Sequence, residues 1–271
     1  MWDAFTLFTK SDLRQSFRAC LCCLALATAA AQGEELRYRI LEEAAHDSAV
    51  FTQGLELDGQ TLVESSGLYG SSFIRRYQVA DNTILAQNKL PRKHFAEGLT
   101  IVGQDLFLLT WRENLLYVLD KNTLKARAKI PYKGEGWGLC FDGSHFVMSN
   151  GSAQLFFRDR KHFKVKRTIT VNEPAAGSPQ ATKTLSYLNE LECAERAIWA
   201  NVWQTSRIVK INPLSGRVMA TLDLSELVSK NGGNFRSVLN GIAYDSERKA
   251  FWVTGKNWSR RYLIEILSEN E

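Results

Sequence analysis

Five side chains that could bind or transform a small molecule recur along the sequence at intervals of about 40–50 residues. They are Gln53, Glu97, Trp137, Asn189 and Asn240, each followed by one residue, usually glycine, and then by leucine or isoleucine. A carboxyl group can accept and return a proton, and amides both donate and accept hydrogen bonds. If these positions are equivalent in a repeated fold, the sequence predicts one site that combines an acid, amides and an indole.

A second set of matched positions follows later in each repeat. It consists of Ser66, Trp111, Asn150, Trp203 and Lys256. Both sets are unusual for a core, because buried charged and amide groups cost free energy unless paired, and tryptophans around a wet cavity expose apolar surface. Aromatic walls with a few convergent polar groups are typical of a pocket for a small molecule or a chain end.

Each of these residues also has a purely structural interpretation. The amides could satisfy neighbouring backbone groups, the tryptophans could fill space, and Glu97 and Lys256 could form a structural ion pair. The functional interpretation is favoured because the unusual residues fall at matched repeat positions.

Short strands must position these residues. The first strand of each repeat opens at Phe51–Leu55, Phe95–Leu99, Gly136–Leu139, Leu188–Leu191 or Leu239–Ile242, and the second strand ends at the second set of positions. Third strands are expected at Phe73–Val79, Leu115–Asp120, Leu155–Asp159, Ile208–Asn212 and Tyr262–Leu267. Fourth strands are expected at Ile84–Leu90, Ala126–Ile130, Val165–Val171 and Val218–Leu224. After residue 31, a helical pattern is confined to a turn near Leu224–Val228.

The fifth repeat lacks a fourth strand, but the alternating segment Leu36–Leu41 precedes the first repeat and can supply it. Pairing this segment with the last repeat closes a ring and removes an exposed sheet edge. The sequence therefore predicts an all-β fold, a five-bladed β-propeller with four antiparallel strands per blade, whose last blade is closed by the N-terminal strand. Since the innermost strands line the channel, the two matched sets would form two rings at one end of it.

Composition limits the partners of the chain. The net charge of +5 is mild, and basic residues such as Lys164, Lys166 and Arg167 belong to an alternating strand face, so we expect no nucleic acid partner. The four histidines, His46, His94, His145 and His162, have no paired ligand spacing, which argues against a zinc site. No cofactor is required by this pattern; a structural Ca²⁺ in the polar channel is possible.

The N-terminus has the pattern of an export signal. Basic residues precede an apolar run from Ala19 to Ala31, and Ala29 and Ala31 form a small-residue cleavage pattern before Gln32. We expect residues 1–31 to be a signal peptide and residues 32–271 the propeller domain, secreted or periplasmic and without stable membrane association after cleavage. An uncleaved anchor is the main alternative, and lipidation is a minor one. Cleavage would leave Cys140 and Cys193, either as buried free thiols or as one bridge.

The motifs together resemble the plant and bacterial glutaminyl cyclases, also called glutaminyl-peptide cyclotransferases. Each motif is a weak pattern, and their specificity comes from the series in order along nearly the whole mature chain. The motifs are FTQGL (51–55), FAEGLT (95–100), LTW (109–111), GEGWGL (134–139), SNGS (149–152), LNELE (188–192), ANVW (200–203), LNGIAYD (239–245) and VTGK (253–256).

The resemblance implies a metal-independent enzyme that cyclises the N-terminal glutamine of peptides and proteins to pyroglutamate and releases ammonia. The implied catalytic residues are Glu97 as general acid and base, Lys256, Gln53 and Asn189. The implied substrate-binding residues are Phe51, Phe95, Trp111, Trp137 and Trp203. The chain departs from the family pattern at Ala96, at Asn150 and at Trp258–Ser259, where the family usually has glycine, aspartate and Trp-Pro.

Two other functions fit parts of the pattern. A Ca²⁺-dependent, lactonase-like propeller hydrolase would use Glu97, Asn150, Asn189 and Asn240 as oxygen ligands. A non-enzymatic propeller would bind a partner protein at its channel mouth. For the cyclase we expect a monomer whose partners are peptides with N-terminal glutamine.

Overall fold

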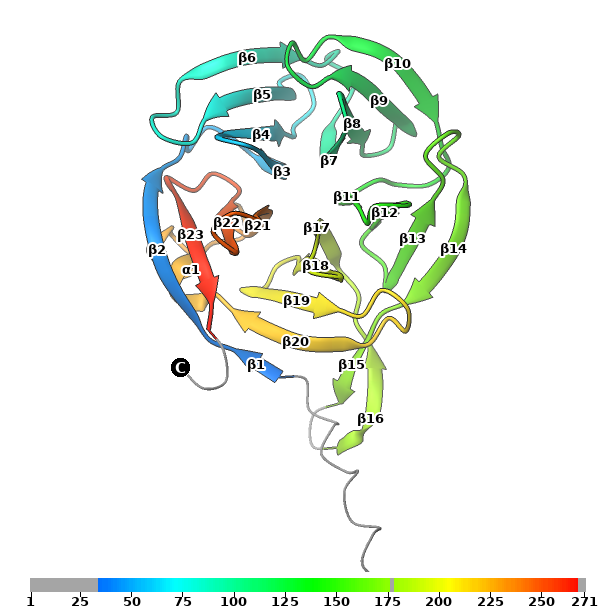
Figure 1. Cartoon of the computed structure of the whole chain (residues 1–271), viewed down its shortest axis with the longest axis vertical. Coiled ribbons are helices and arrows are strands. Elements are labelled where there is room, and N and C mark those ends of the chain that lie inside the picture. Colours follow the sequence, from blue (N-terminus) through cyan, green and yellow to red (C-terminus); the bar gives the residue numbers. More distant parts are fainter. Residues whose placement is uncertain (1–33, 176–177, 268–271) are drawn as a thin grey trace, which may run out of the picture. The chain divides into compact units, whose positions relative to one another are not determined.

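The computed structural model describes residues 34–175 and 178–267, which lie within the unit that spans Gln32–Glu271. Five sheets stand around a central channel like the blades of a propeller (Figure 1). The predicted all-β, five-bladed fold is therefore confirmed. The predicted signal segment, residues 1–31, lies outside the described residues.

Successive strands build each blade from the channel outward. The first blade is β3 (Thr52–Asp58), β4 (Thr61–Ser66), β5 (Phe73–Gln78) and β6 (Ile84–Lys89). The second is β7 (Ala96–Val102), β8 (Asp105–Thr110), β9 (Leu115–Asp120) and β10 (Ala126–Pro131). The third is β11 (Leu139–Phe141), β12 (Phe146–Met148), β13 (Gln154–Arg158) and β14 (Val165–Thr170). The fourth contains β17 (Leu188–Ala194), β18 (Ala197–Val202), β19 (Arg207–Ile211) and β20 (Val218–Asp223).

The fifth blade joins the two ends of the described chain. Its strands β21 (Leu239–Asp245), β22 (Ala250–Gly255) and β23 (Arg260–Ile266) are completed by β2 (Tyr38–Ala45), which is antiparallel to β23 (Figure 1). The predicted closure by the N-terminal strand is thus confirmed. β2 covers the outer edge of β23 and ties both ends of the described chain into one blade.

The start of the closing strand was predicted wrongly. Leu36 belongs to a separate short strand, β1 (Glu34–Leu36), which pairs in parallel with β20. The fourth blade therefore has five strands, one of them parallel. Alternation of apolar and polar residues indicates an extended chain but does not identify its partner, so the passage from one blade to the next was not visible in the sequence.

Two further elements lie outside the four-strand repeat. The hairpin of β15 (Asn172–Ala175) and β16 (Ser178–Thr184) projects from the ring between the third and fourth blades (Figure 1). The short helix α1 (Ser225–Lys230) follows β20, where the sequence indicated a helical turn. No described helix has both the length and the apolar character to span a bilayer.

Each interface between neighbouring blades has its own apolar core. Between the first two blades, for example, Val63 and Ile74 pack with Leu99, Leu108 and Leu119. Separate clusters of buried side chains fill the other four interfaces. Burial of apolar surface thus holds the blades at fixed angles around the channel, which makes the channel wall a rigid support for polar side chains.

A bulge interrupts the inner strand at most of the first-ring positions. The ladder register shifts between Thr52 and Gly54 in β3, between Ala96 and Leu99 in β7, and likewise in β17 and β21. A bulge re-aims the side chain at the irregular position. The bulges therefore explain why Gln53, Glu97 and Asn189 point into the channel.

A glycine follows the bulged residue in β3, β7 and β21, whereas Glu190 follows it in β17; in β7 the glycine is required by the closeness of the inner strands. A Cβ atom on Gly98 would lie 2.6 Å from the carbonyl oxygen of Trp137. In its actual position the Gly98 N–H donates to that same oxygen at 2.6 Å. Any larger residue would force the second and third blades apart, so the recurrent glycine reflects the convergence of the blades at the axis.

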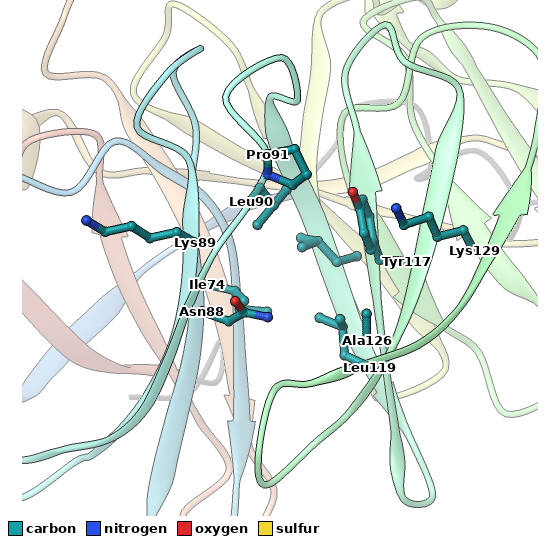
Figure 2. A pocket seen from close by; sticks show the side chains of 10 residues that line it. Ile74, Asn88, Lys89, Leu90, Pro91, Tyr117, Leu119, Ala126 and Lys129 are labelled. Atoms are coloured by element: carbon teal, nitrogen blue, oxygen red, sulfur yellow. The ribbon is translucent and has the colours of Figure 1, made fainter.

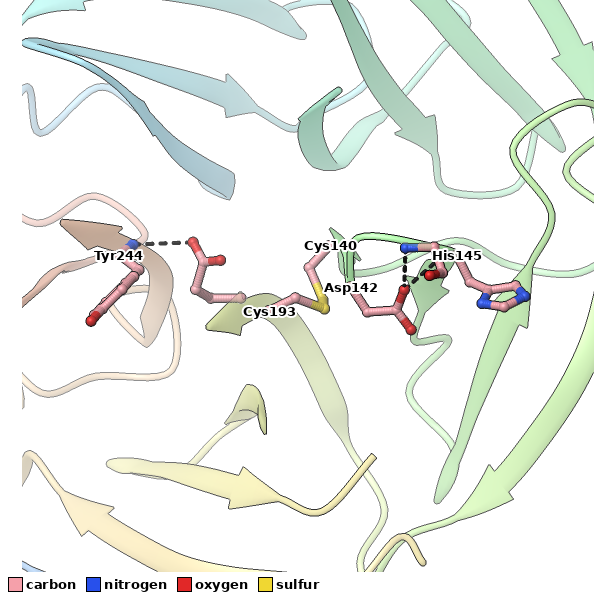
Figure 3. The surroundings of a disulfide bond; sticks show 7 residues. Cys140, Asp142, His145, Cys193 and Tyr244 are labelled. Carbon is pink, nitrogen blue, oxygen red and sulfur yellow. Dashed lines mark hydrogen bonds between the residues drawn. A yellow bond between two sulfur atoms is a disulfide. The ribbon is translucent and has the colours of Figure 1, made fainter. Parts of the chain in front are cut away.

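A disulfide between Cys140 and Cys193 joins β11 to β17, the innermost strands of the third and fourth blades (Figure 3). Of the two alternatives left open by the sequence, the structure has the bridge. Asp142 Oδ1 accepts hydrogen bonds from the backbone of Ser144 and His145 beside it, which closes the turn between β11 and β12 (Figure 3).

Candidate active site

A cavity of about 270 Å³ opens at one end of the channel. Every residue that the sequence predicted for catalysis or substrate binding lines it. These are Phe51, Gln53, Phe95, Glu97, Trp111, Trp137, Asn189, Trp203 and Lys256. The lining also includes Leu68, Phe235 and Val238, which lie outside the repeat positions and carry no polar group that would have singled them out.

Three of the ring positions do not line the cavity. Asn240 donates to the carbonyl oxygen of Thr52 at 2.9 Å, so it links the fifth blade to the first. Ser66 Oγ accepts from the backbone of Phe51, and Asn150 Oδ1 accepts from Ser152. At these three positions the side chains form hydrogen bonds within the fold, although Oδ1 of Asn240 has no partner among the described residues.

Among the residues that the structure describes, Glu97 is the only carboxylic acid that lines the cavity. Its Oε1 accepts a hydrogen bond from Gln53 Nε2 at 3.3 Å, and its side chain is buried. Burial raises the pKa of Glu97 well above its usual range; Lys256 opposes this shift, and the carboxylates of Glu113 and Glu135 add to it. A carboxyl group whose pKa is moved toward neutrality can both accept and return a proton at working pH.

Lys256 lies in the same cavity but is not in direct contact with Glu97. Its Nζ is 4.7 Å from the ring centroid of Phe51, a cation–π arrangement. Within residues 34–175 and 178–267, no ion pair of 4.0 Å or less joins Lys256 to Glu97. Burial lowers the pKa of Lys256 to about 8, against the opposing charge of Glu97. The structural ion pair weighed from the sequence is therefore not formed.

Asn189 lines the cavity and has an unused acceptor atom. Its side chain is buried, and its Oδ1 has no hydrogen-bond partner among the described residues. An unsatisfied buried amide oxygen costs about 1–3 kcal/mol. A ligand that donates an N–H at this point would recover that cost, so the arrangement favours an amide or amine in the cavity.

Aromatic rings form the walls around these polar groups. Trp137 and Trp203 meet edge to face, with their ring centroids 5.6 Å apart. Phe95 packs against Trp111, with their ring centroids 5.4 Å apart. Such walls exclude water and hold a flat or extended group between them.

Two acids behind the aromatic wall were not predicted. Glu135 Oε2 accepts from the indole N–H of Trp111 at 2.9 Å and of Trp137 at 3.2 Å. Glu113 accepts from the hydroxyl of Tyr69 and from the backbone of Phe95. Both residues fix the wall from outside the cavity. Glu135 stands in the motif GEGWGL, two residues before a ring position, and that proximity was the available signal.

A metal ion in the channel would need several ligand atoms close together. Among the described residues, no group of three or more His, Cys, Asp or Glu side chains could hold a metal ion. Glu190, which faces the channel next to Asn189, uses its two carboxylate oxygens to accept the backbone N–H groups of Leu55 and Ile242. Because Asn150 and Asn240 point elsewhere, the four oxygen ligands of the lactonase-like alternative do not converge.

A second hollow, of about 210 Å³, lies between the outer strands of the first and second blades. Lys89 and Lys129 stand on opposite sides of it, with Tyr117 in its wall (Figure 2). No acid and no predicted site residue lines it. The chemistry indicated by the sequence is therefore concentrated at the channel end.

Comparisons with known proteins show which family the chain resembles. The family model described as glutamine cyclotransferase matches residues 16–266. The chain is 36% identical over 234 residues to the glutaminyl-peptide cyclotransferase of Arabidopsis thaliana, covering 84% of this chain and 70% of the relative. The crystal structure of Myxococcus xanthus glutaminyl cyclase is similar with a TM-score of 0.78 and 30% identity, covering 88% of this chain and 100% of that one.

Proposed function

The chain belongs to the glutamine cyclotransferase family, and from this premise we propose that the cavity around Glu97 is its catalytic centre. Like its relatives, the chain is a transferase that converts the N-terminal glutamine of peptides to pyroglutamate. One observation supports this assignment most strongly. The carboxyl group of Glu97 is buried in a small aromatic cavity that Gln53, Asn189 and Lys256 also line.

The reaction requires a proton to move between two nitrogens of one residue. The free α-amine attacks the side-chain carbonyl carbon, a carbon–nitrogen bond forms, and the bond to the side-chain nitrogen breaks to release ammonia. An α-amine has a pKa of about 7.7–8.0, so it must lose a proton before or during attack. The departing nitrogen must gain one, so a single group that shuttles the proton serves both steps.

Glu97 performs this shuttle. Its carboxylate takes the proton from the α-amine as the new bond forms and returns it to the leaving nitrogen. The raised pKa of Glu97 suits both directions, because a base or acid acts best when its pKa lies near the operating pH. Such transfer contributes about 10²–10⁴-fold to the rate.

Lys256 stabilises charge on the carbonyl oxygen of the substrate. The ammonium group is buried in the cavity lining and has no direct ion pair with Glu97, which leaves it available to the developing oxyanion. Asn189 Oδ1 accepts from a substrate N–H, and Gln53 holds the carboxyl group of Glu97. These contacts orient the amine toward the carbonyl carbon, and orientation supplies much of the rate.

The tryptophan walls hold the glutamine side chain in a folded conformation. Trp137 and Trp203, fixed at right angles, form a corner against which the aliphatic part of the side chain packs. The walls also exclude water, which would otherwise compete for the polar groups. The chemistry then rests on protein side chains, and we propose that it requires no metal.

We further propose the cellular setting. The basic and apolar N-terminal segment favours export, so the enzyme would work as a secreted or periplasmic monomer on peptides that reach the same compartment. Mass spectrometry of the mature protein checks this, since cleavage after Ala31 leaves Gln32 as the first residue. An intact residue 1 on the exported protein contradicts the proposal.

The test of function is ammonia release from a peptide with N-terminal glutamine. We expect turnover by the purified protein and a loss of about 10²–10⁴-fold in kcat for Glu97→Gln, which keeps the shape and removes the proton transfer. The melting temperature of this variant should not fall. Burial raises the pKa of Glu97 in the folded state, so the ionised group costs stability above its ordinary pKa, and glutamine removes that cost.

Two controls separate the alternatives. Glu226→Gln, on the exposed face of α1, should leave turnover unchanged. Incubation with a chelator should also leave it unchanged; loss of activity that Ca²⁺ restores would support the metal-dependent hydrolase instead. If the protein binds glutaminyl peptides without releasing ammonia, the binding-module alternative is correct.

A further inference from the structure

Exposed apolar side chains gather at the mouth of the cavity. Leu68 and Phe235 belong to the cavity lining itself, yet they are 44% and 72% exposed. Tyr69, 49% exposed, packs against Phe95 and Trp111, and Tyr187, 56% exposed, packs against Trp203. We call these four residues, Leu68, Tyr69, Tyr187 and Phe235, the apolar rim. An exposed apolar group of this kind, continuous with a binding cavity, indicates a contact surface.

The backbone holds two rim residues in an unfavourable conformation. Leu68 has φ 90° and Tyr187 has φ 66°, both in the left-handed region that bulky residues rarely adopt. Hydrogen bonds impose these conformations: the carbonyl oxygen of Leu68 accepts from Ser71 and Ser72, and Tyr187 is bonded to Gly151 and Trp203. Backbone strain that is maintained by its surroundings is concentrated at ligand sites.

Phe235 is held outward by an ordered loop. Asn234 Oδ1 accepts from the backbone of Arg236 at 2.9 Å and of Ser237 at 3.2 Å. The carbonyl oxygen of Ser237 in turn accepts from the indole N–H of the buried Trp258 at 2.9 Å. The exposed ring is therefore placed at the mouth by anchored backbone.

The volume of the cavity limits how much of the peptide substrate can lie inside it. A volume of about 270 Å³ is slightly below that of most small-molecule sites, about 300–1,000 Å³, so the cavity accommodates one terminal residue and not a peptide. With the N-terminal glutamine at Glu97, the rest of the substrate must leave through the mouth. The second residue is then the first to meet the apolar rim.

We propose that the apolar rim is a second binding subsite, which takes the side chain of the residue after the N-terminal glutamine and favours apolar and aromatic residues there. The inference rests on the proposed function and adds a substrate preference to it. Burial of an apolar side chain against the rim removes two apolar surfaces from water at once.

The experiment compares kcat/KM for tripeptide amides that begin with glutamine and carry Phe, Leu, Gly or Asp at the second position. For the unmodified protein we expect the Phe and Leu peptides to exceed the Gly peptide by about tenfold, the lower end for discrimination by an apolar site, since the rim is partly open to solvent. Most of the difference should lie in KM. The ratio of the Phe to the Gly peptide should fall to about twofold or less in the double variant Tyr187→Ser with Phe235→Ser, which loses this apolar contact.

Leu214→Ser is the matched control, because Leu214 is 82% exposed in the turn between β19 and β20 and does not line the cavity. It should leave the ratio unchanged. Equal kcat/KM for the Phe and Gly peptides, or a preference that survives the double variant, overturns the subsite while leaving the proposed function intact. Absence of turnover with every peptide, the Gly peptide included, contradicts the proposed function instead.

Discussion

The charges around Glu97 determine when it can act. Lys256 lowers the pKa of Glu97, whereas Glu113 and Glu135 raise it together with burial. The three residues reach Glu97 through the electrostatic field, since none of them has a hydrogen bond or ion pair to it among the described residues. At the residue scale, therefore, the working pH depends on groups that need not touch the proton-transfer group.

Lys256→Met should move the acidic limb of the pH profile upward. Without the ammonium group, the pKa of Glu97 rises further, so the active ionised form appears only at higher pH. The rate at the optimum should also fall by about 10²–10³-fold, the usual cost of one lost oxyanion donor. The acidic limb of kcat/KM reports the shift, and NMR titration of the carboxyl carbon of Glu97 reports it even if turnover is too slow.

Glu135→Gln should shift the pKa of Glu97 in the direction opposite to Lys256→Met, so it controls for the sign of the electrostatic effect. It removes a carboxylate that raises the pKa of Glu97, so the acidic limb should move downward. Glutamine can still accept from the two indoles, which keeps the wall in place. A shift in the same direction for both variants would contradict the electrostatic account.

The residues of the site were predictable because they occupy equivalent places in the repeat. Gln53, Glu97 and Asn189 differ chemically from the apolar residues around them, and this contrast at matched positions revealed them. Glu135 and Glu113 lie off these positions: Glu135 stands two residues before one of them, which is a weak signal, and Glu113 has no such signal. Their importance depends on the distance to indole and backbone N–H groups, which only the folded chain defines.

At the scale of elements, the strands were predicted well and their irregularities were not. The pattern of residue, glycine and aliphatic residue marked the start of most inner strands, but the bulge that turns Glu97 into the channel is a shift of register between two strands. The partner of β1 was likewise not predictable, because pairing with β20 is a long-range contact. Local sequence specifies extended structure, and register follows from packing.

The closing strand β2 is secured at its end by a buried histidine–glutamate pair. His46 follows β2, and its Nε2 lies 2.8 Å from Oε1 of Glu64 in the first blade, while its Nδ1 lies 2.8 Å from the carbonyl oxygen of Trp258 in the fifth. Burial alone would lower the pKa of His46, but the charge and hydrogen bond of Glu64 raise it above its ordinary value. His46 thus connects the first blade to the fifth.

His46→Gln should weaken the ring more at low pH than at high pH. Because the folded state raises the pKa of His46, the pair contributes its full stability below about pH 6.5 and loses it as pH rises through the folded pKa. Breaking such a buried pair costs about 3 kcal/mol. Denaturant unfolding at pH 6 and pH 9 measures the difference. The exposed His162→Gln should show no pH-dependent loss, and an equal loss at both pH values for His46→Gln would show that the pair is uncharged.

At the scale of the whole molecule, the ring could be predicted from the repeats, because the strand that the last repeat lacks is found before the first repeat. Contacts between residues far apart in the sequence could not be predicted. Four complete repeats and one incomplete repeat require closure, and the chain closes as expected through β2. The bridge between Cys140 and Cys193 could not be derived, since two cysteines in different repeats are equally compatible with free thiols. Their Cα atoms lie 5.4 Å apart only because the third and fourth blades converge at the axis.

This bridge should stabilise the whole ring without taking part in the reaction. It closes a loop with a sequence separation of 53 residues, and the entropy it removes from the unfolded chain corresponds to about 4 kcal/mol. Replacing both cysteines by serine should therefore lower the melting temperature, while turnover at 25 °C persists because neither cysteine lines the cavity. A reductant should lower the melting temperature of the unmodified protein toward that of the double variant and leave the variant unchanged. Equal melting temperatures with and without reductant would show that the two thiols are not bridged in solution.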